Sequence, residues 1–305
     1  MIYDTIIIGS GPAGLTAAIY AQRSEIKTVV LEKAPMSGGQ VINTYEVDNY
    51  PGTPGISGFD LSMQFREHTE KLGTVFVNGE VKKFHIEDDI KVLTLEDGEE
   101  YRAKTIIIAT GGVPRHLNVE GEEKYSGLGI SYCATCDGAF FKNKVAAVVG
   151  GGDVAVEDAI FLSRVCKKVY IIHRRDEFRA SKGNVSKLKA QANIEFVLDS
   201  VVEKINGNDI VDSIEIKNVK NEQTTTLDVD GVFIAVGYIP NTAIYKEIIN
   251  TDEAGYIIAD ETCETNIPGV FAAGDVRTKK LRQIVTATAD GASAVTAVEH
   301  YLNTL

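Results

Sequence analysis

Short apolar runs recur along the chain, several of them ending in glycine, and each predicts a buried strand of a parallel sheet. The first run, Tyr3–Ile8, leads into Gly9, and a second, Lys27–Leu31, follows after a segment rich in alanine. The alanine-rich segment predicts a helix. Strand, glycine turn, helix and strand in this order are typical of a nucleotide-binding α/β unit.

Apolar and polar residues alternate over 74–108 and again over 194–228. Alternation with turn signals such as Asp97-Gly98 predicts antiparallel hairpins. Two further segments predict helices: 59–72, where apolar residues recur at three- and four-residue spacing, and 285–302, which is rich in small residues.

The pattern of strand, glycine turn and helix occurs a second time in the middle of the chain. Its parts are a strand at 144–149, glycines at 150–152, a helix at 156–165 and a further strand at 169–172. The chain thus carries two nucleotide-binding modules built on one plan.

A last apolar strand, Gly269–Asp275, has to return to the first module, which makes that module discontinuous. We therefore expect an α/β fold of two Rossmann-like three-layer domains, one inserted in the other, each with a small antiparallel β-meander. The expected boundaries are 1–113 plus 245–305 for the first domain and 114–244 for the second.

Gly9, Gly11 and Gly14 form a G-x-G-x-x-G turn between the first predicted strand and helix. Glycines at these places permit a tight turn and the close approach of a pyrophosphate to the helix N-terminus. Glu32 ends the second strand, 23 positions after Gly9, where a carboxylate accepts a hydrogen bond from a ribose hydroxyl. The first module is therefore predicted to bind a dinucleotide.

The second module differs at the matching place, because His173 stands 23 positions after Gly150 and is followed by Arg174, Arg175 and, further on, Arg179. Arginines grip a 2′-phosphate bidentately, whereas an acid suits a free 2′-hydroxyl. A solvated basic turn is the alternative. The position at the end of a nucleotide-binding strand favours a phosphate site, so we predict that this module prefers NADP(H) to NAD(H).

Composition and charge narrow the range of partners. The chain has 305 residues and a formal net charge of −12, which argues against nucleic acid or an anionic membrane as its main partner. No apolar run approaches the roughly 18 to 20 residues that span a bilayer. The N-terminal residues include an acid, Asp4, instead of the basic start of a signal peptide. We expect a cytosolic protein.

Cys133-Ala-Thr-Cys136-Asp137 lies between the two glycine signatures, in a chain with only four cysteines. A C-x-x-C pair in a large cytosolic chain is typically redox-active or binds zinc. Zinc needs two further ligands, and Cys166 and Cys263 are isolated, so we favour redox chemistry and expect no metal. The residues after the pair are compatible with a short helix whose N-terminus favours thiolates.

Six motifs in a fixed order give the chain a resemblance to the low-molecular-weight thioredoxin reductases along its whole length. These motifs are Gly9–Gly14, Ser37–Gln40, Cys133–Asp137, Gly150–Ala155, His173–Arg179 and Gly274-Asp275. The resemblance implies FAD in the first module, NADPH in the second, and a homodimer that passes electrons to thioredoxin.

The resemblance also implies site residues by position. The FAD site would comprise Gly9, Ser10, Gly11, Pro12, Ala13, Gly14, Glu32, Lys33, Gly39, Gln40, Asn49, Ala109, Gly111, Gly274, Asp275, Arg282 and Gln283. The NADPH site would comprise Gly152, Asp153, Val154, Ala155, Glu157, His173, Arg174, Arg175, Arg179 and Gly237. Asp275 would bind the ribityl chain. Val154 departs from the family, which commonly has Ser or Thr there, and lacks their hydroxyl as a phosphate contact.

By the same resemblance, Cys136 would face the flavin and take its electrons, while Cys133 would attack the disulfide of the partner. Asp137 has two interpretations, as the group that supplies or accepts a proton in this exchange or as a helix-start residue that interacts with backbone N–H groups. Two other functions also remain open: a thiol reductase of the same fold fed by ferredoxin or NADH, and a non-catalytic flavoprotein redox sensor.

Overall fold

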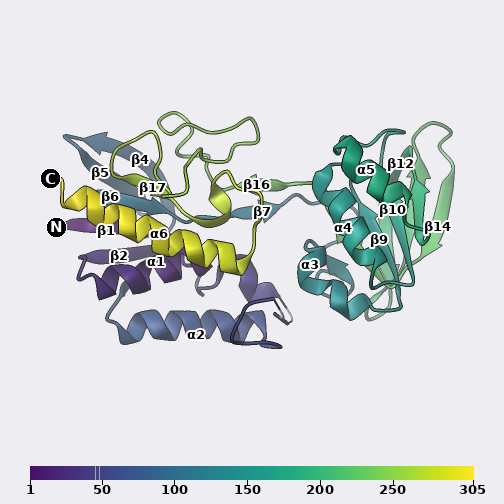
Figure 1. The fold of residues 1–305 in the computed structure, drawn as a ribbon, viewed down its shortest axis with the longest axis horizontal. Coiled ribbons are helices and arrows are strands. Elements are labelled where there is room, and N and C mark those ends of the chain that lie inside the picture. Colours follow the sequence, from purple (N-terminus) through teal and green to yellow (C-terminus); the bar gives the residue numbers. More distant parts are fainter. Residues whose placement is uncertain (45, 48) are drawn as a thin grey trace. The chain divides into compact units, whose positions relative to one another are not determined.

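The computed structural model describes residues 1–44, 46–47 and 49–305, which form two compact units (Figure 1). The first unit comprises Met1–Val113 and Ile239–Leu305, and the second comprises Pro114–Tyr238. The second junction therefore lies six residues before the expected boundary at 244/245. That each unit folds as an independent domain remains a prediction.

A seven-stranded sheet forms the centre of the first unit, in the order β3-β2-β1-β6-β5-β4 with β17 also paired to β6. The strands are β1 (Ile2–Ile8), β2 (Thr28–Glu32), β3 (Val75–Asn78), β4 (Val81–Glu87), β5 (Ile90–Leu95), β6 (Glu100–Ile108) and β17 (Val270–Ala272). Only β4, β5 and β6 form the expected hairpins, because β3 pairs in parallel with β2. The C-terminal strand β17 returns to this sheet in parallel with β6.

Three helices accompany this sheet, α1 (Pro12–Arg23), α2 (Gly58–Lys71) and α6 (Ile284–Leu302), and α6 lies along α1 (Figure 1). Proline at the first position of α1 and the alanines that follow favour a helix there. Successive strand residues point to opposite faces. Ile7 therefore packs in the core beneath α1 and α6, while Ile6 and Ile8 pack in the core on the other face.

The second unit has a five-stranded parallel sheet in the order β11-β10-β9-β15-β8. Its strands are β8 (Ile130–Ser131), β9 (Val145–Val149), β10 (Lys168–Ile172), β11 (Ile194–Val197) and β15 (Gly231–Ile234). Helices α4 (Asp153–Ser163) and α5 (Lys182–Lys189) cover one face. An antiparallel sheet of β12 (Ser200–Gly207), β13 (Val211–Asn218) and β14 (Thr224–Asp228) covers the other. The prediction of two Rossmann-like units is confirmed.

Helix α5 is not evident in the hydrophobic pattern, because Leu188 is its only buried residue. Its start is marked by Ser181, whose hydroxyl accepts a hydrogen bond from the backbone N–H of Asn184. The two chain crossings between the units, β7 (Gly112–Pro114) and β16 (Tyr238–Pro240), pair as a two-stranded sheet.

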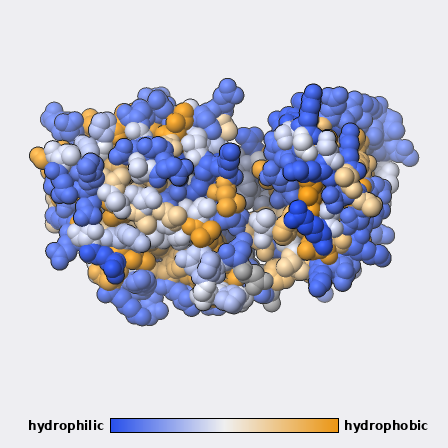
Figure 2. All heavy atoms as spheres, viewed as in Figure 1, coloured by the Kyte–Doolittle hydropathy of each residue, from blue (hydrophilic) through white to orange (hydrophobic). Residues whose placement is uncertain are grey.

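Among the described residues, no helix is long and apolar enough to cross a membrane. On the face shown in Figure 2, hydrophilic side chains predominate and apolar ones form small separate groups.

Candidate active site

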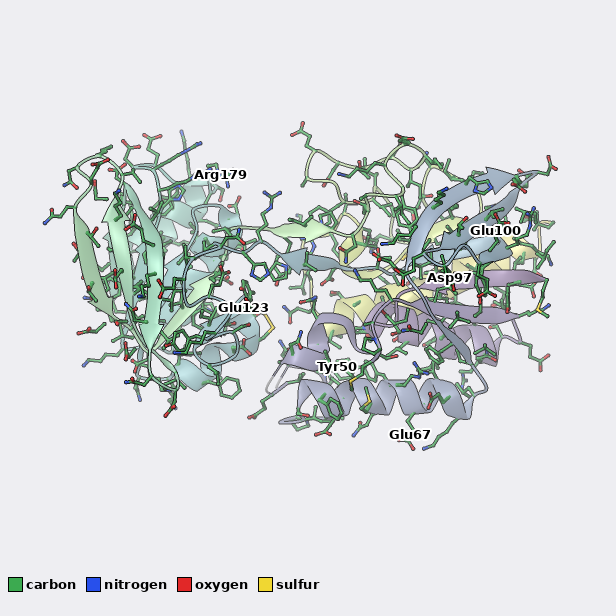
Figure 3. The ribbon with its side chains drawn as sticks, turned by 180° about the vertical axis from the view of Figure 1, so that it is seen from behind. Tyr50, Glu67, Asp97, Glu100, Glu123 and Arg179 are labelled. Atoms are coloured by element: carbon green, nitrogen blue, oxygen red, sulfur yellow. A yellow bond between two sulfur atoms is a disulfide. The ribbon has the colours of Figure 1, made fainter. Side chains whose placement is uncertain are left out.

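Cys133 and Cys136 form a disulfide in the second unit, with their Cα atoms 5.3 Å apart (Figure 3). The short helix α3 (Ala134–Asp137) begins directly after Cys133, and its first turn closes because the backbone N–H groups of Cys136 and Asp137 donate to the Cys133 carbonyl. The residues after the pair form a short helix, as expected, although it is a 3₁₀ helix, and another short helix starts within the pair itself. Helix α3 includes Cys136, and the residues that follow, Gly138–Phe141, form the 3₁₀ helix η2.

The Asp137 carboxyl is partly buried next to the disulfide in the chain and accepts a hydrogen bond of 2.5 Å from the Ser131 hydroxyl. The same hydroxyl oxygen accepts the Cys133 backbone N–H at 3.0 Å. Burial raises the pKa of Asp137, against the opposing effect of the Ser131 hydrogen bond. Neither α3 nor η2 is capped by a side chain, so the carboxyl does not serve as a helix cap. A partly buried acid with a raised pKa suits proton transfer.

A buried carboxylate that the motifs do not indicate anchors the residue before Cys133. Glu122 accepts hydrogen bonds from the Tyr132 hydroxyl at 2.8 Å and from the backbone N–H groups of Leu117 and Asn118 at 3.1 and 2.7 Å. Burial opposes its ionisation, but these hydrogen bonds outweigh burial and lower the pKa of Glu122. A loop glutamate carries no periodic signal, and only the folded structure brings it to Tyr132.

Glycine is found at the positions of the first turn for two different physical reasons. A Cβ on Gly14 would lie 1.9 Å from the Gly9 carbonyl oxygen, and one on Gly9 would lie 2.5 Å from the Ala109 carbonyl oxygen. Backbone packing therefore requires Gly9 and Gly14. A Cβ on Gly11 would meet only the Cα of Gly39, at 3.9 Å. The fold leaves the face of the turn at Gly11 open, which fits the close approach of a pyrophosphate.

Glu32 is tied to the same turn. Its carboxylate accepts hydrogen bonds from the backbone N–H and the hydroxyl of Ser10 at 2.6 and 2.7 Å, and from the Ala34 N–H at 2.8 Å. A carboxylate has about four acceptor positions, so one remains for a ribose hydroxyl. The sequence predicted the ribose contact but not the bonds to Ser10.

Further candidate residues gather around this turn. The Gly38 N–H donates to the Ser10 carbonyl at 2.8 Å, which brings Gly39 and Gln40 to it at the start of the 3₁₀ helix η1 (Gly39–Asn43). Elsewhere in the first unit, the Asn49 amide donates to Gln283 at 2.9 Å. The remaining candidates lie in the first turn of α1, after β2, after β6 and after β17: Pro12, Ala13, Lys33, Ala109, Gly111 and Gly274.

Among the buried polar atoms of the first unit that have no hydrogen-bond partner within the described residues, two belong to candidate FAD residues. They are Oδ1 of Asp275, in the 3₁₀ helix η3 (Gly274–Val276), and Nε of Arg282, whose guanidinium lies 4.0 Å from the centre of the Tyr256 ring. Burial raises the pKa of Asp275. Buried polar atoms in folded proteins are nearly always satisfied, so an acceptor and a donor left open fit a polar ligand such as the ribityl chain of a flavin.

The second glycine turn packs against the arginine-rich segment. A Cβ on Gly151 would lie 2.2 Å from the His173 ring, and the Arg179 N–H donates to the Gly151 carbonyl at 2.8 Å. Gly152 caps α4, and a Cβ there would meet nothing within 4 Å. Nε2 of His173 is buried without a partner among the described residues. The turn therefore has an open face and an unused polar atom nearby.

Three guanidinium groups, those of Arg174, Arg175 and Arg179, lie at the surface of the second unit, where Figure 3 labels Arg179. Within the described part of the chain, none of them has an acidic partner at salt-bridge distance. The neighbouring acid Asp176 pairs instead with Lys220, at 3.3 Å. The arginines thus keep their charge available for an anion.

Other candidates in the second unit have structural partners. Asp153 accepts hydrogen bonds from the Ser181 N–H at 2.9 Å and the Asn184 amide at 3.3 Å, and Glu157 accepts from the same amide at 3.0 Å. These two acids therefore join α4 to α5, a role the sequence did not indicate. Val154 is 57% exposed, Ala155 is buried, and Gly237 accepts a hydrogen bond from the Arg115 N–H at the end of the unit.

The FAD candidates all belong to the first unit, and the NADPH candidates and the cysteine pair to the second. Cys166 and Cys263 are buried free thiols. Across the described ranges, no group of three or more histidine, cysteine or acidic side chains could hold a metal ion.

The chain is similar to known oxidoreductases over its whole length. Residues 3–291 match the model of the pyridine nucleotide-disulphide oxidoreductase family. A thioredoxin reductase of Listeria innocua is 45% identical over 305 residues, covering 100% of this chain and 95% of that protein. The crystal structure of a thioredoxin reductase from Streptococcus pyogenes is 49% identical, with a TM-score of 0.93 and coverage of 100% and 99% of the two chains.

A more distant structure, the thioredoxin reductase of Giardia duodenalis, is 38% identical, with a TM-score of 0.93 and 99% of each chain covered. With its two Rossmann-like units and the Cys133–Cys136 disulfide, the chain belongs to the pyridine nucleotide-disulphide oxidoreductase family, among the thioredoxin reductases.

Proposed function

We propose that this thioredoxin reductase uses NADPH and FAD, with FAD in the first unit, NADPH in the second, and Cys133–Cys136 as the group that reduces oxidised thioredoxin. The net reaction consumes NADPH, one proton and the thioredoxin disulfide, and forms NADP⁺ and the thioredoxin dithiol. The observation that carries this proposal is the disulfide itself, which lies beside a partly buried acid in the unit that also holds the unpaired arginine cluster.

Family membership implies a flavin and a pyridine nucleotide. FAD, when bound, supplies a carrier that takes two electrons from a nicotinamide and passes them to a disulfide. The residues present fit it: the turn is open at Gly11, Glu32 keeps one acceptor position, and Asp275 and Arg282 offer buried polar atoms without partners.

The two cysteines carry out the last step, the transfer of electrons to thioredoxin. Two electrons and two protons convert the Cys133–Cys136 disulfide to two thiols. The Cys133 thiolate then attacks the thioredoxin disulfide, forms a mixed disulfide and releases one thiolate, which takes up a proton. Cys136 attacks the Cys133 sulfur in turn and displaces the second thioredoxin thiol. Asp137, partly buried next to the pair, holds the proton that these thiolates exchange.

A steady-state assay with candidate thioredoxins, in which NADPH and NADH are compared, tests this function. We expect thioredoxin-dependent oxidation of NADPH and much slower oxidation of NADH. Turnover with NADH or reduced ferredoxin alone would identify the rival thiol reductase. If NADPH bleaches the flavin absorbance but no thioredoxin is reduced catalytically, the chain acts as a redox sensor.

Replacement of Arg174 and Arg175 by alanine is expected to raise the KM for NADPH by about 10- to 100-fold, because a hydrogen bond between charged groups contributes roughly 1.5–3 kcal/mol. The KM for NADH should change little, since NADH has no 2′-phosphate. Initial rates with both nucleotides measure this effect. Lys189→Ala, which removes an exposed cation from α5, is the matched control. An equal rise in both KM values would contradict a role in 2′-phosphate recognition.

Asp137→Asn is expected to slow turnover about 100-fold or more, because an amide cannot transfer the proton. The raised pKa means that ionised Asp137 destabilises the folded state. The protonated carboxyl contributes favourably to stability. This contribution is complete below the ordinary pKa of 3.8 and disappears as pH rises through the folded pKa. The variant should therefore unfold at a higher temperature than the wild type at pH 8, with a smaller difference at pH 4.

Turnover rates and thermal unfolding at both pH values check this prediction. Glu123→Gln, an exposed acid in the same unit, is the control and should change neither quantity. A variant that keeps normal turnover at every pH would remove Asp137 from the chemistry.

We further propose that the enzyme works as a homodimer in the cytosol. The two buried free thiols, Cys166 and Cys263, are typical of a reducing compartment, where cysteines remain unpaired. Sedimentation of the FAD-loaded protein tests the dimer, since a monomer at assay concentrations would exclude it. Cell fractionation tests the location.

A further inference from the structure

A buried ionic cluster lies in the first unit between α6 and the segment after β17. The Arg277 guanidinium donates to both oxygens of Asp290, from Nε at 2.9 Å and from Nη2 at 2.8 Å, and Lys279 Nζ donates to Oδ2 at 2.7 Å. All three side chains are less than one tenth exposed. Buried charges carry a large desolvation cost, so a cluster of two cations and one anion is weak evidence for stability alone.

Asp290 also holds the turn that carries Asp275. Its Oδ2 accepts the backbone N–H of Gly274 at 2.8 Å. Gly274 has a φ of +79°, in the left-handed region, and a Cβ there would lie 2.9 Å from the Cβ of Ala13. The turn is thus fixed from two sides, by α1 and by the Asp290 carboxylate. Asp275, the next residue, has its unpartnered buried oxygen in this turn.

The residue after Asp290 fixes α6 against α1. A Cβ on Gly291 would lie 2.3 Å from the Ala13 carbonyl oxygen and 3.0 Å from the Ala17 nitrogen, so the two helices approach closely at the first turn of α1. Helix α1 begins at the first glycine turn. Asp290 and Gly291 together therefore set the Gly274-Asp275 turn relative to the start of α1.

We propose that Asp290 is a positioning residue of the flavin site, which aligns Asp275 with the first glycine turn without touching the cofactor. This inference rests on the proposed binding of FAD in the first unit. Asp290 accepts four hydrogen bonds, from Arg277 twice, from Lys279 and from Gly274. An asparagine supplies one acceptor oxygen, places its NH₂ group against donors and leaves two buried cations without an anion. Asparagine at position 290 should therefore release the Gly274 turn.

The test compares Asp290→Asn with Glu299→Gln, which removes one negative charge from an exposed position on the same helix. Full-length protein is purified, and the rate of FAD release is followed by the rise of flavin fluorescence on dilution. The unfolding temperature is then measured against added FAD, because a ligand stabilises the folded state in proportion to the logarithm of its concentration over Kd. For Asp290→Asn we expect a Kd for FAD at least about tenfold weaker and a smaller FAD-dependent rise in unfolding temperature.

A merely structural role predicts a different result. Asp290→Asn would then lower the unfolding temperature without FAD but leave the FAD-dependent rise and the Kd at the values of Glu299→Gln, which would overturn the proposal. If Asp290→Asn does not fold, Asp290→Glu keeps the charge and shifts the carboxylate by one methylene. It should fold and bind FAD more weakly, and unchanged affinity would also overturn the proposal. A wild type that binds no FAD refutes the proposed function itself.

Discussion

Cys136→Ser is expected to reduce thioredoxin reduction to the background rate, while NADPH still bleaches the flavin absorbance. A serine hydroxyl cannot form the disulfide with Cys133, so no group remains that accepts two electrons and passes them on as a dithiol. The unit with the arginine cluster is otherwise unchanged, and the FAD candidates lie in the other unit. Anaerobic flavin bleaching and steady-state thioredoxin reduction, measured on the same preparation, separate the two half-reactions.

Cys166→Ala provides the matched control, because burial raises the pKa of that thiol to about 11 and keeps it unreactive at neutral pH. Thioredoxin reduction by this control should stay at the wild-type rate. Substantial thioredoxin reduction by Cys136→Ser would mean that electrons leave the protein by another route. Failure of NADPH to bleach the flavin in the wild type would instead contradict the assignment of the nucleotide.

Two alanine substitutions in the first glycine turn are expected to have different effects, one on stability and the other on FAD binding. Gly14→Ala places a methyl group where it would lie 1.9 Å from the Gly9 carbonyl oxygen, so strand β1 and helix α1 have to separate. Overpacking of this kind costs roughly 1–3 kcal/mol, and a clash with rigid backbone belongs at the upper end. Gly11→Ala meets nothing nearer than 3.9 Å, and Gly11 has an ordinary φ of −75°. Its fold should therefore be unaffected.

The two variants are compared by thermal unfolding without added FAD and by FAD affinity. Gly14→Ala is expected to unfold at a lower temperature. Gly11→Ala should unfold like the wild type without FAD but bind FAD at least about tenfold more weakly, because its methyl group occupies the open face of the turn. Normal FAD affinity in Gly11→Ala would show that the pyrophosphate does not approach this face.

The residues that carry the chemistry of this protein lie close together in the chain. A strand that ends in glycine and opens a helix needs only neighbouring residues, so both glycine turns could be predicted from the pattern. Cys133 and Cys136 are three positions apart and join across one helical turn, and the arginine segment directly follows β10. These features rest on short-range geometry that the order of residue types specifies.

The arrangement around that chemistry depends on the tertiary structure. Asp290 lies 16 residues from Gly274, and in the sequence it is only an acid among the small residues of a predicted helix. The bonds of Glu122 to Tyr132 and of Glu32 to Ser10, and the pairing of β3 with β2, likewise join separate segments. Such contacts form only when distant elements pack together and buried polar groups must find partners. The sequence by itself therefore determined the cysteine pair and the two glycine turns, whereas only the tertiary structure decided which side chains hold them in place.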